Sequence, residues 1–189
     1  MDLVEQYFVA QDGFGAVVAE VPARRWDAPS PCAAWTVRDI VGHVLWGRHR
    51  LAAWVTGADY PETAGEPGAP NPGVLCAGDP AWEWRVAFEA TAPALTRAGL
   101  ARVTSVADAG GVPLTTLLPA FISDALVHTW DIAQAVGLTV TLDPAVVKAT
   151  DEWVRSIPLR RPEFFGPERT PPAGADETTR LLAFLGRAA

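Results

Sequence analysis

The chain has 189 residues, 49% of them hydrophobic and 20% charged, with a mean hydropathy of +0.13. This composition excludes a disordered chain and is typical of a single globular domain, residues 1–189, that buries a core without disulfides or a structural metal. The net charge of −7 argues against nucleic acid as a partner, and without a membrane-spanning apolar run or a basic leader we expect a cytoplasmic protein that binds no membrane.

Apolar periodicity and capping signals predict six helices, at residues 2–21, 36–56, 79–98, 116–136, 143–157 and 177–185. Capping boxes open the first two, Asp2 with Glu5 and Thr36 with Asp39. In the third and fifth helices, Asp is followed by Pro at the first helical position. Residues 57–78 are rich in proline and glycine, so we expect a long surface loop that either covers a site or connects two helices passively.

The later part of the chain adds a short hairpin and a well-marked helix end. Residues 102–106 and 112–114 alternate in polarity around Gly110 and Gly111, which predicts a hairpin. Gly137 is expected to end the fourth helix as its C-cap. Four principal helices with accessory short ones, joined partly by long crossover loops, predict an all-α four-helix bundle, a fold that builds metal sites in its core.

Two acids and a histidine share one face of the predicted helix 116–136. Asp124, His128 and Asp131 are spaced to lie together, and His43 lies at the edge of the apolar stripe of its own helix. Burying unpaired carboxylates is costly, and apart from His128 nothing basic lies on that face. A divalent metal held by His43, Asp124 and His128 accounts for the pattern, with Asp131 as a further ligand or as the acceptor that orients an imidazole.

The same residues also fit an arrangement without a metal. Asp124 and His128 are spaced as an ordinary hydrogen-bonded pair, and His43 fits a core histidine bonded to a backbone carbonyl. Cys32 and Cys76 form no Cys-x-x-Cys pair, so we expect them to be buried free thiols. Spacing alone therefore leaves metal binding open.

Three runs of the chain resemble one family, and they are residues 30–43 (SPCAAWTVRDIVGH), 127–133 (VHTWDIA) and 181–187 (LLAFLGR). The family is the actinobacterial metal-binding proteins of the DinB-like superfamily, in particular the group that shares the N-terminal domain of mycothiol-dependent maleylpyruvate isomerase. The resemblance implies a DinB-like four-helix bundle with a divalent metal, usually zinc. It also implies that a histidine matching His43 and a carboxylate-x-x-x-histidine pair matching Asp124 and His128 are the ligands.

The chain departs from that family in two respects. Asp124 stands where related sequences usually have glutamate, and because aspartate is one methylene shorter, the bond to a metal requires a closer helix or a bridging water. The isomerase also carries a second, C-terminal domain that contributes to its active site. No such domain follows within the 189 residues, which argues against maleylpyruvate isomerisation.

Three protein ligands leave a coordination position for water or substrate. The resemblance implies a thiol transferase or isomerase-like enzyme in which a small thiol such as mycothiol binds the metal, ionises and attacks an electrophilic substrate. The alternatives are a hydrolase with Asp131 as general base, an iron oxygenase with two histidines and one carboxylate, and a protein that binds a metal or small ligand without catalysis. The expected partners are the thiol and the electrophile, and a second copy of the chain in a homodimer is a further candidate.

Overall fold

The structure is a computed structural model, and it describes residues 1–32, 35–102, 105–106, 110–157 and 166–188. Over these residues it is all-helical, as the sequence predicts, and its only β-pairing consists of isolated bridges. The elements in chain order are α1 (Leu3–Glu20), η1 (Ala23–Arg25), α2 (Val37–Thr56), η2 (Pro72–Cys76), α3 (Pro80–Thr91), α4 (Arg97–Arg102), α5 (Leu114–Val136), α6 (Pro144–Ser156) and α7 (Glu177–Phe184).

The helix ends follow from capping chemistry that is visible in the sequence. Both predicted capping boxes are present, Asp2 with Glu5 at the start of α1 and Thr36 with Asp39 at the start of α2. Gly137, with φ of 79°, ends α5 in the left-handed conformation that a residue without a side chain adopts most easily. Aspartate side chains also accept hydrogen bonds from the first backbone N–H groups of α3, α6 and α7.

The prediction of one helix over residues 79–98 is wrong, because the chain forms two helices there. α3 ends at Thr91 and α4 begins at Arg97. Pro93 lies between them, and a proline inside a helix removes an amide donor and clashes with the carbonyl one turn earlier. The predicted hairpin is a single bridge between Val106 and Val112, and residues 103–104 and 107–109 lie outside the described part of the chain.

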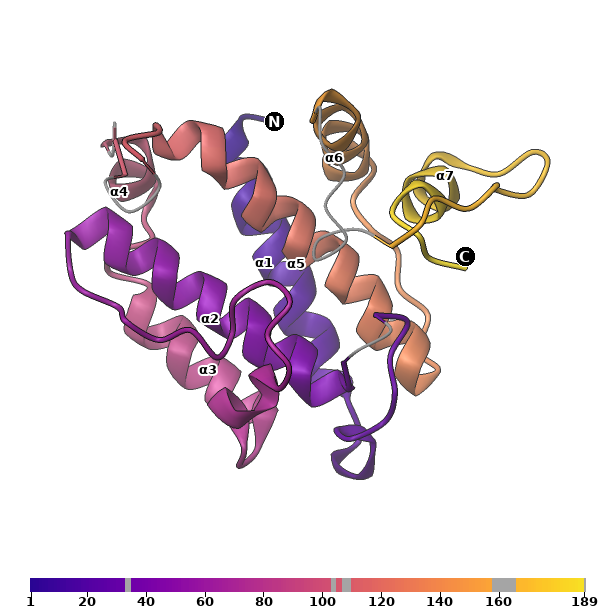
Figure 1. Cartoon of the computed structure of the whole chain (residues 1–189), viewed down its shortest axis with the longest axis horizontal. Helices are drawn as coiled ribbons and strands as arrows, with labels where there is room; N and C mark the ends of the chain where they lie inside the picture. The colour runs from indigo at the N-terminus through magenta and orange to yellow at the C-terminus, as the bar shows by residue number, and fades with distance from the viewer. Residues whose placement is uncertain (33–34, 103–104, 107–109, 158–165, 189) are drawn as a thin grey trace.

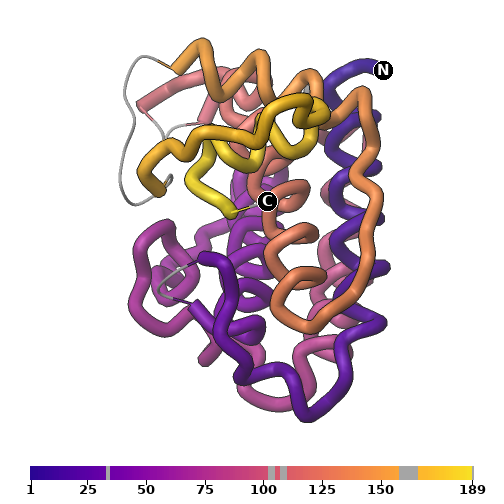
Figure 2. The backbone as a smooth tube through the Cα atoms, turned by 90° about the vertical axis from the view of Figure 1, so that its right-hand side faces the viewer, coloured from indigo at the N-terminus to yellow at the C-terminus, as the bar shows by residue number. Residues whose placement is uncertain are grey.

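Helix α5 is the centre of the molecule. It packs lengthwise against α1 and also contacts α2, while α3 packs on α1 and α2, so these four helices form the bundle (Figure 1). Its core holds fully buried side chains such as Phe14, Ile40, Leu51, Leu118 and Ile132. Helix α6 packs on α5 and α7, and the C-terminal segment lies beside α5 in both views (Figures 1 and 2). Among the described helices, none is sufficiently long and apolar to cross a bilayer.

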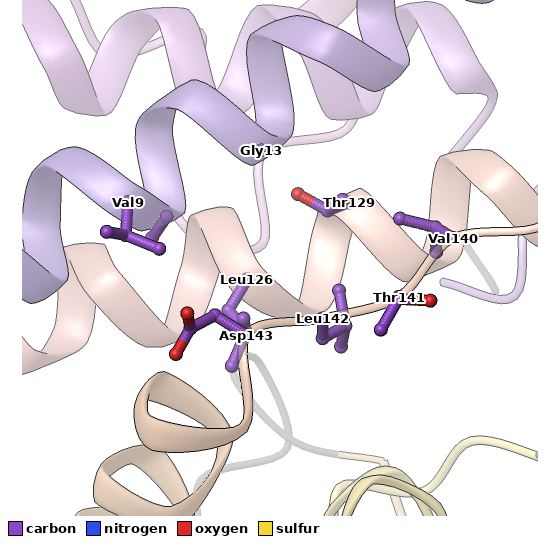
Figure 3. A pocket seen from close by; sticks show the side chains of 9 residues that line it. Val9, Gly13, Leu126, Thr129, Val140, Thr141, Leu142 and Asp143 are labelled. Carbon is purple, nitrogen blue, oxygen red and sulfur yellow. The ribbon is translucent and has the colours of Figure 1, made fainter.

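A cavity of about 130 Å³ lies between α1, α5 and the linker to α6 (Figure 3). Val9 and Gly13 of α1 face Leu126 and Thr129 of α5 across it. Asp143 is the one ionisable group among its described lining residues, and that carboxylate caps α6. Since Leu126 lies about 200° around α5 from Asp124, this cavity opens on a different face of α5 from the predicted metal ligands.

Candidate metal centre

Helix α2 brings His43 to the face of α5 that carries Asp124. Nδ1 of His43 lies 2.6 Å from the carbonyl oxygen of Gly65, and Nε2 lies 3.1 Å from Oδ1 of Asp124. A carbonyl oxygen only accepts hydrogen bonds, so the ring carries a proton on Nδ1. In the neutral ring, Nε2 therefore presents a lone pair to the Asp124 carboxylate.

His128 is held in the same way by a second acceptor. Nδ1 of His128 lies 2.9 Å from Oδ2 of Asp131, and Nε2 lies 3.3 Å from Oδ1 of Asp124. Asp131 is fully buried, and it also accepts hydrogen bonds from Arg187, at 3.2 Å from Nε and 2.7 Å from Nη2. The ion pair with Arg187 keeps Asp131 an anion, and an anion requires the His128 proton on Nδ1.

Three electron-pair donors thus point at one another. One ligand atom from each of His43, Asp124 and His128 lies within 4.8 Å of the other two, and both Nε2 atoms contact Oδ1 of Asp124. In a tetrahedral zinc site with bonds of about 2.0–2.1 Å, neighbouring ligand atoms are about 3.3–3.4 Å apart, which is close to the two nitrogen–oxygen distances of 3.1 and 3.3 Å. Imidazole nitrogen and carboxylate oxygen are ligands that zinc accepts. The residues therefore fit a divalent cation, and Asp124 reaches the common point although it is shorter than glutamate.

In the metal-free protein, the pKa values of His128 and Asp124 also indicate that this site favours a positive charge. Burial by itself lowers the pKa of His128, but the charge of Asp124 and the hydrogen bonds with Asp124 and Asp131 outweigh it and raise this pKa to about 9. Burial by itself raises the pKa of Asp124, yet His43 and His128 hold this pKa well below its usual range. Without a metal, a proton at His128 supplies part of the missing positive charge.

Asp131 has a partner that the sequence did not reveal. His128 is the one basic residue that α5 itself carries on this face, as the sequence indicates, but the C-terminal segment places Arg187 against both oxygens of Asp131. These oxygens lie on the Nδ1 side of His128, away from the three converging donor atoms. Of the two roles that the sequence leaves open for Asp131, the geometry favours orienting the imidazole.

Residues 57–78, termed the strap below, pass across α2 (Figure 1), and they contact His43. Besides the bond from His43 to Gly65, Nε1 of Trp46 donates to the carbonyl of Glu62 at 2.7 Å and Nε1 of Trp35 donates to the carbonyl of Ala69 at 2.9 Å. The strap also lies so close to α2 that a Cβ at Gly65 would be 2.1 Å from Cβ of Trp46. The strap is therefore a fitted wall of the site and not a passive connection.

A cavity of about 70 Å³ opens beside the converging donors, and none of its described lining residues belongs to the strap. Its lining includes Asp124, Val127 and His128 of α5, Trp153 of α6, and Leu185 and Arg187 of the C-terminal segment. The Asp124 side chain is 31% exposed, compared with 7% for His43 and 6% for His128. Access to the three donors is therefore from the side of Asp124.

The thiols of the chain are poor nucleophiles. Cys76 is buried and Cys32 is partly buried, and burial raises the pKa of Cys32 to about 11 and that of Cys76 to about 12. The third histidine, His49, is on α2 but stacks on Tyr60 with ring centroids 5.7 Å apart. Neither the cysteines nor His49 belongs to the group of converging donors.

Comparison with known proteins gives the family. Residues 9–133 match the family described as the mycothiol maleylpyruvate isomerase N-terminal domain. An uncharacterized protein of Mycobacterium tuberculosis (strain ATCC 25618 / H37Rv) is 31% identical over 193 residues, which cover 99% of this chain and 98% of that protein. A second uncharacterized protein of the same strain is 46% identical over 35 residues, which are 18% of this chain and 14% of that protein.

Solved structures give the fold. The crystal structure of the mycothiol-dependent maleylpyruvate isomerase superposes with a TM-score of 0.54 at 16% identity, covering 78% of this chain and 67% of that chain. A variant of that enzyme with a histidine changed to alanine gives a TM-score of 0.51 at 15% identity. The resemblance read from the sequence and the DinB-like helical bundle are both confirmed. The chain belongs to the mycothiol maleylpyruvate isomerase N-terminal domain family.

Proposed function

We propose that this protein is a metal-dependent enzyme of mycothiol chemistry, a thiol transferase or isomerase-like enzyme, in which His43, Asp124 and His128 hold a divalent metal, with zinc preferred. The observation that carries the proposal is the convergence of two Nε2 atoms and one carboxylate oxygen, each imidazole being fixed by an acceptor on its other nitrogen. Membership of a family described by mycothiol supports the choice of thiol.

The bound metal supplies an open coordination position and enough positive charge to ionise a thiol near neutral pH. The residues of the chain prepare that position. Gly65 and Asp131 hold the Nδ1 protons, so both imidazoles keep their Nε2 atoms free for the metal. Arg187 offsets the charge of Asp131, and Asp124 offsets only part of the charge of a divalent cation. The loaded centre therefore keeps a net positive charge and attracts an anion such as a thiolate.

The attacking sulfur comes from a small thiol and not from the protein. Since burial raises the pKa of both Cys32 and Cys76, neither side chain ionises readily near neutral pH. Trp35 lies against both imidazoles, with ring centroids 4.7 Å from His43 and 5.8 Å from His128, and keeps water from that side. In this setting, the thiol would give its proton to solvent water and its sulfur would form a bond to the electrophilic carbon of a small substrate, while the double bond at that carbon opens and its electron pair takes up a proton from water.

Asp131, the candidate general base of the hydrolytic alternative, is already engaged by two hydrogen-bond donors. Both oxygens of Asp131 accept hydrogen bonds, Oδ1 from Arg187 and Oδ2 from Arg187 and His128. Burial by itself raises the pKa of Asp131, but the hydrogen bond from His128 and the charge of Arg187 outweigh it and lower that pKa. An acid held as an anion by two donors is a weak acceptor of a proton from water, so the geometry does not support hydrolysis with Asp131 as general base.

The proposal is tested by the metal content of purified protein, measured by elemental analysis. We expect about one zinc per chain in the wild type and in His49→Ala, a histidine of the same helix outside the centre, and strong loss in His43→Ala and His128→Ala. Metal content unchanged in the last two variants would falsify the site. The zinc protein is then incubated with mycothiol and electrophiles. Metal binding without consumption of any pair contradicts the enzymatic part and supports a binding protein.

A further inference from the structure

We propose that the ligand that completes the metal's coordination enters through the cavity beside Val127, and that Trp153 restricts it to thiols whose sulfur-bearing carbon is unbranched. The preference for a thiol rests on the proposed function. The route of entry does not, because it applies to any small anion that binds the metal. Trp153 would then be a specificity-determining residue.

The route follows from what closes the other sides. Nδ1 of His43 is covered by the strap, and the faces of its ring lie near Trp35 and Trp46, with centroids 4.7 and 6.4 Å away. Asp131 and Arg187 cover Nδ1 of His128. The side that remains open is that of the Asp124 carboxylate, which is partly exposed and lines the cavity. An exogenous ligand therefore approaches from the cavity.

The size and lining of the cavity set the class of ligand. Its volume of about 70 Å³ is several times the roughly 10–15 Å³ that a single water needs, so it admits a sulfur and the carbon attached to it. Val127, Leu185 and the indole of Trp153 give it an apolar lining that suits a methylene group. Arg187 also lines this cavity, where its guanidinium is paired with Asp131.

The residues that we propose select the ligand belong to the C-terminal part of this chain. The family match ends at residue 133, whereas Trp153, Leu185 and Arg187 come from α6 and the segment after α7. Trp153 is partly buried and faces α5 across the cavity, so replacing its indole by a methyl group enlarges the cavity without touching a metal ligand. Trp82, which is 47% exposed on α3, provides a matched tryptophan away from the cavity.

The first test compares two thiols on the cobalt-substituted protein, where sulfur binding gives a charge-transfer absorption band. N-acetylcysteine and N-acetylpenicillamine differ only by two methyl groups on the sulfur-bearing carbon. We expect the wild type and Trp82→Ala to prefer N-acetylcysteine by at least about 10-fold in Kd, and Trp153→Ala to lose most of that preference while its cobalt affinity is unchanged. Equal binding of the two thiols by the wild type, or full selectivity in Trp153→Ala, overturns the proposal.

The second test follows the route with azide as the probe, and it does not depend on thiol chemistry. Val127→Phe fills the cavity and Val127→Ala enlarges it. We expect azide to bind cobalt at least about 10-fold more weakly in Val127→Phe and no more weakly in Val127→Ala, with circular dichroism and cobalt content confirming that both are folded and loaded. Azide binding that is unchanged in Val127→Phe, or absent in the wild type, overturns the route. Azide binding without any thiol binding contradicts the proposed function and the selectivity, and leaves the route supported.

Discussion

A methyl group at residue 65 is expected to separate the strap from His43. In Gly65→Ala the new Cβ would lie 2.1 Å from Cβ and 2.4 Å from Cγ of Trp46. Carbon atoms that are not bonded pack about 3.5–4.0 Å apart, and the Trp46 Cβ is fixed to α2, so the strap must retreat by about 1.5 Å. The distance from Nδ1 of His43 to the Gly65 carbonyl is 2.6 Å, and such a shift carries it beyond hydrogen-bonding range.

The loss of this bond has a measurable size. A hydrogen bond contributes about 0.5–1.5 kcal/mol net, and removing a group that orients a metal-binding histidine lowers metal affinity about 10- to 100-fold. We therefore expect the zinc Kd of Gly65→Ala to rise at least about 10-fold, measured by competition with a chromophoric chelator. Gly78→Ala is the control, because a Cβ there makes an ordinary 3.6 Å contact with Glu83. If folded Gly65→Ala binds zinc as tightly as the wild type, the carbonyl does not position His43.

Four further predictions concern the ligands and their partners. Asp131→Asn weakens the hold on Nδ1 of His128 and should raise the zinc Kd about 10- to 100-fold, by the same competition assay. Because the pKa of His128 is raised to about 9, zinc must displace a proton below that pH, so calorimetry should show affinity that rises with pH up to about 9 and then levels off. In the metal-free protein, this raised pKa contributes stability that is present below pH 6.5 and lost as pH rises through about 9, which chemical denaturation should detect. Asp124→Glu adds a methylene where Oδ1 already lies 3.1 Å from Nε2 of His43, so its zinc affinity should fall, and tighter binding would contradict the fit of aspartate to this site.

The local part of this structure was predictable from the sequence. Capping boxes at Asp2 and Thr36 and the glycine after α5 mark helix ends through contacts between residues a few positions apart. The spacing of Asp124 and His128 places both on one helical face for the same reason. The break at Pro93 was also encoded locally, but the apolar pattern continues past it and predicts one helix where the chain forms two.

The contacts that complete the centre join distant parts of the chain. Arg187 reaches Asp131 across 56 residues, and no periodicity relates a residue after the last helix to a particular face of α5. The acceptor for His43 is harder still to predict, since it is a backbone carbonyl that every residue possesses. Residue 65 must be glycine because the strap lies so close to Trp46 that a Cβ has no room there. That close approach arises from the packing of the folded chain, so the sequence alone does not single out Gly65 as the residue that contacts His43.

The centre is assembled from two parts of the chain with different tasks. The three converging donors, together with Gly65 and Asp131, lie within residues 9–133, the span that matches the family. The groups that line the approach from outside, Trp153, Leu185 and Arg187, lie beyond that span. Arg187 belongs to both parts, because it lines the cavity and also fixes Asp131 and, through it, His128. A change in the C-terminal segment that displaces Arg187 should therefore alter metal affinity as well as ligand choice, whereas a change confined to Trp153 should alter ligand choice alone.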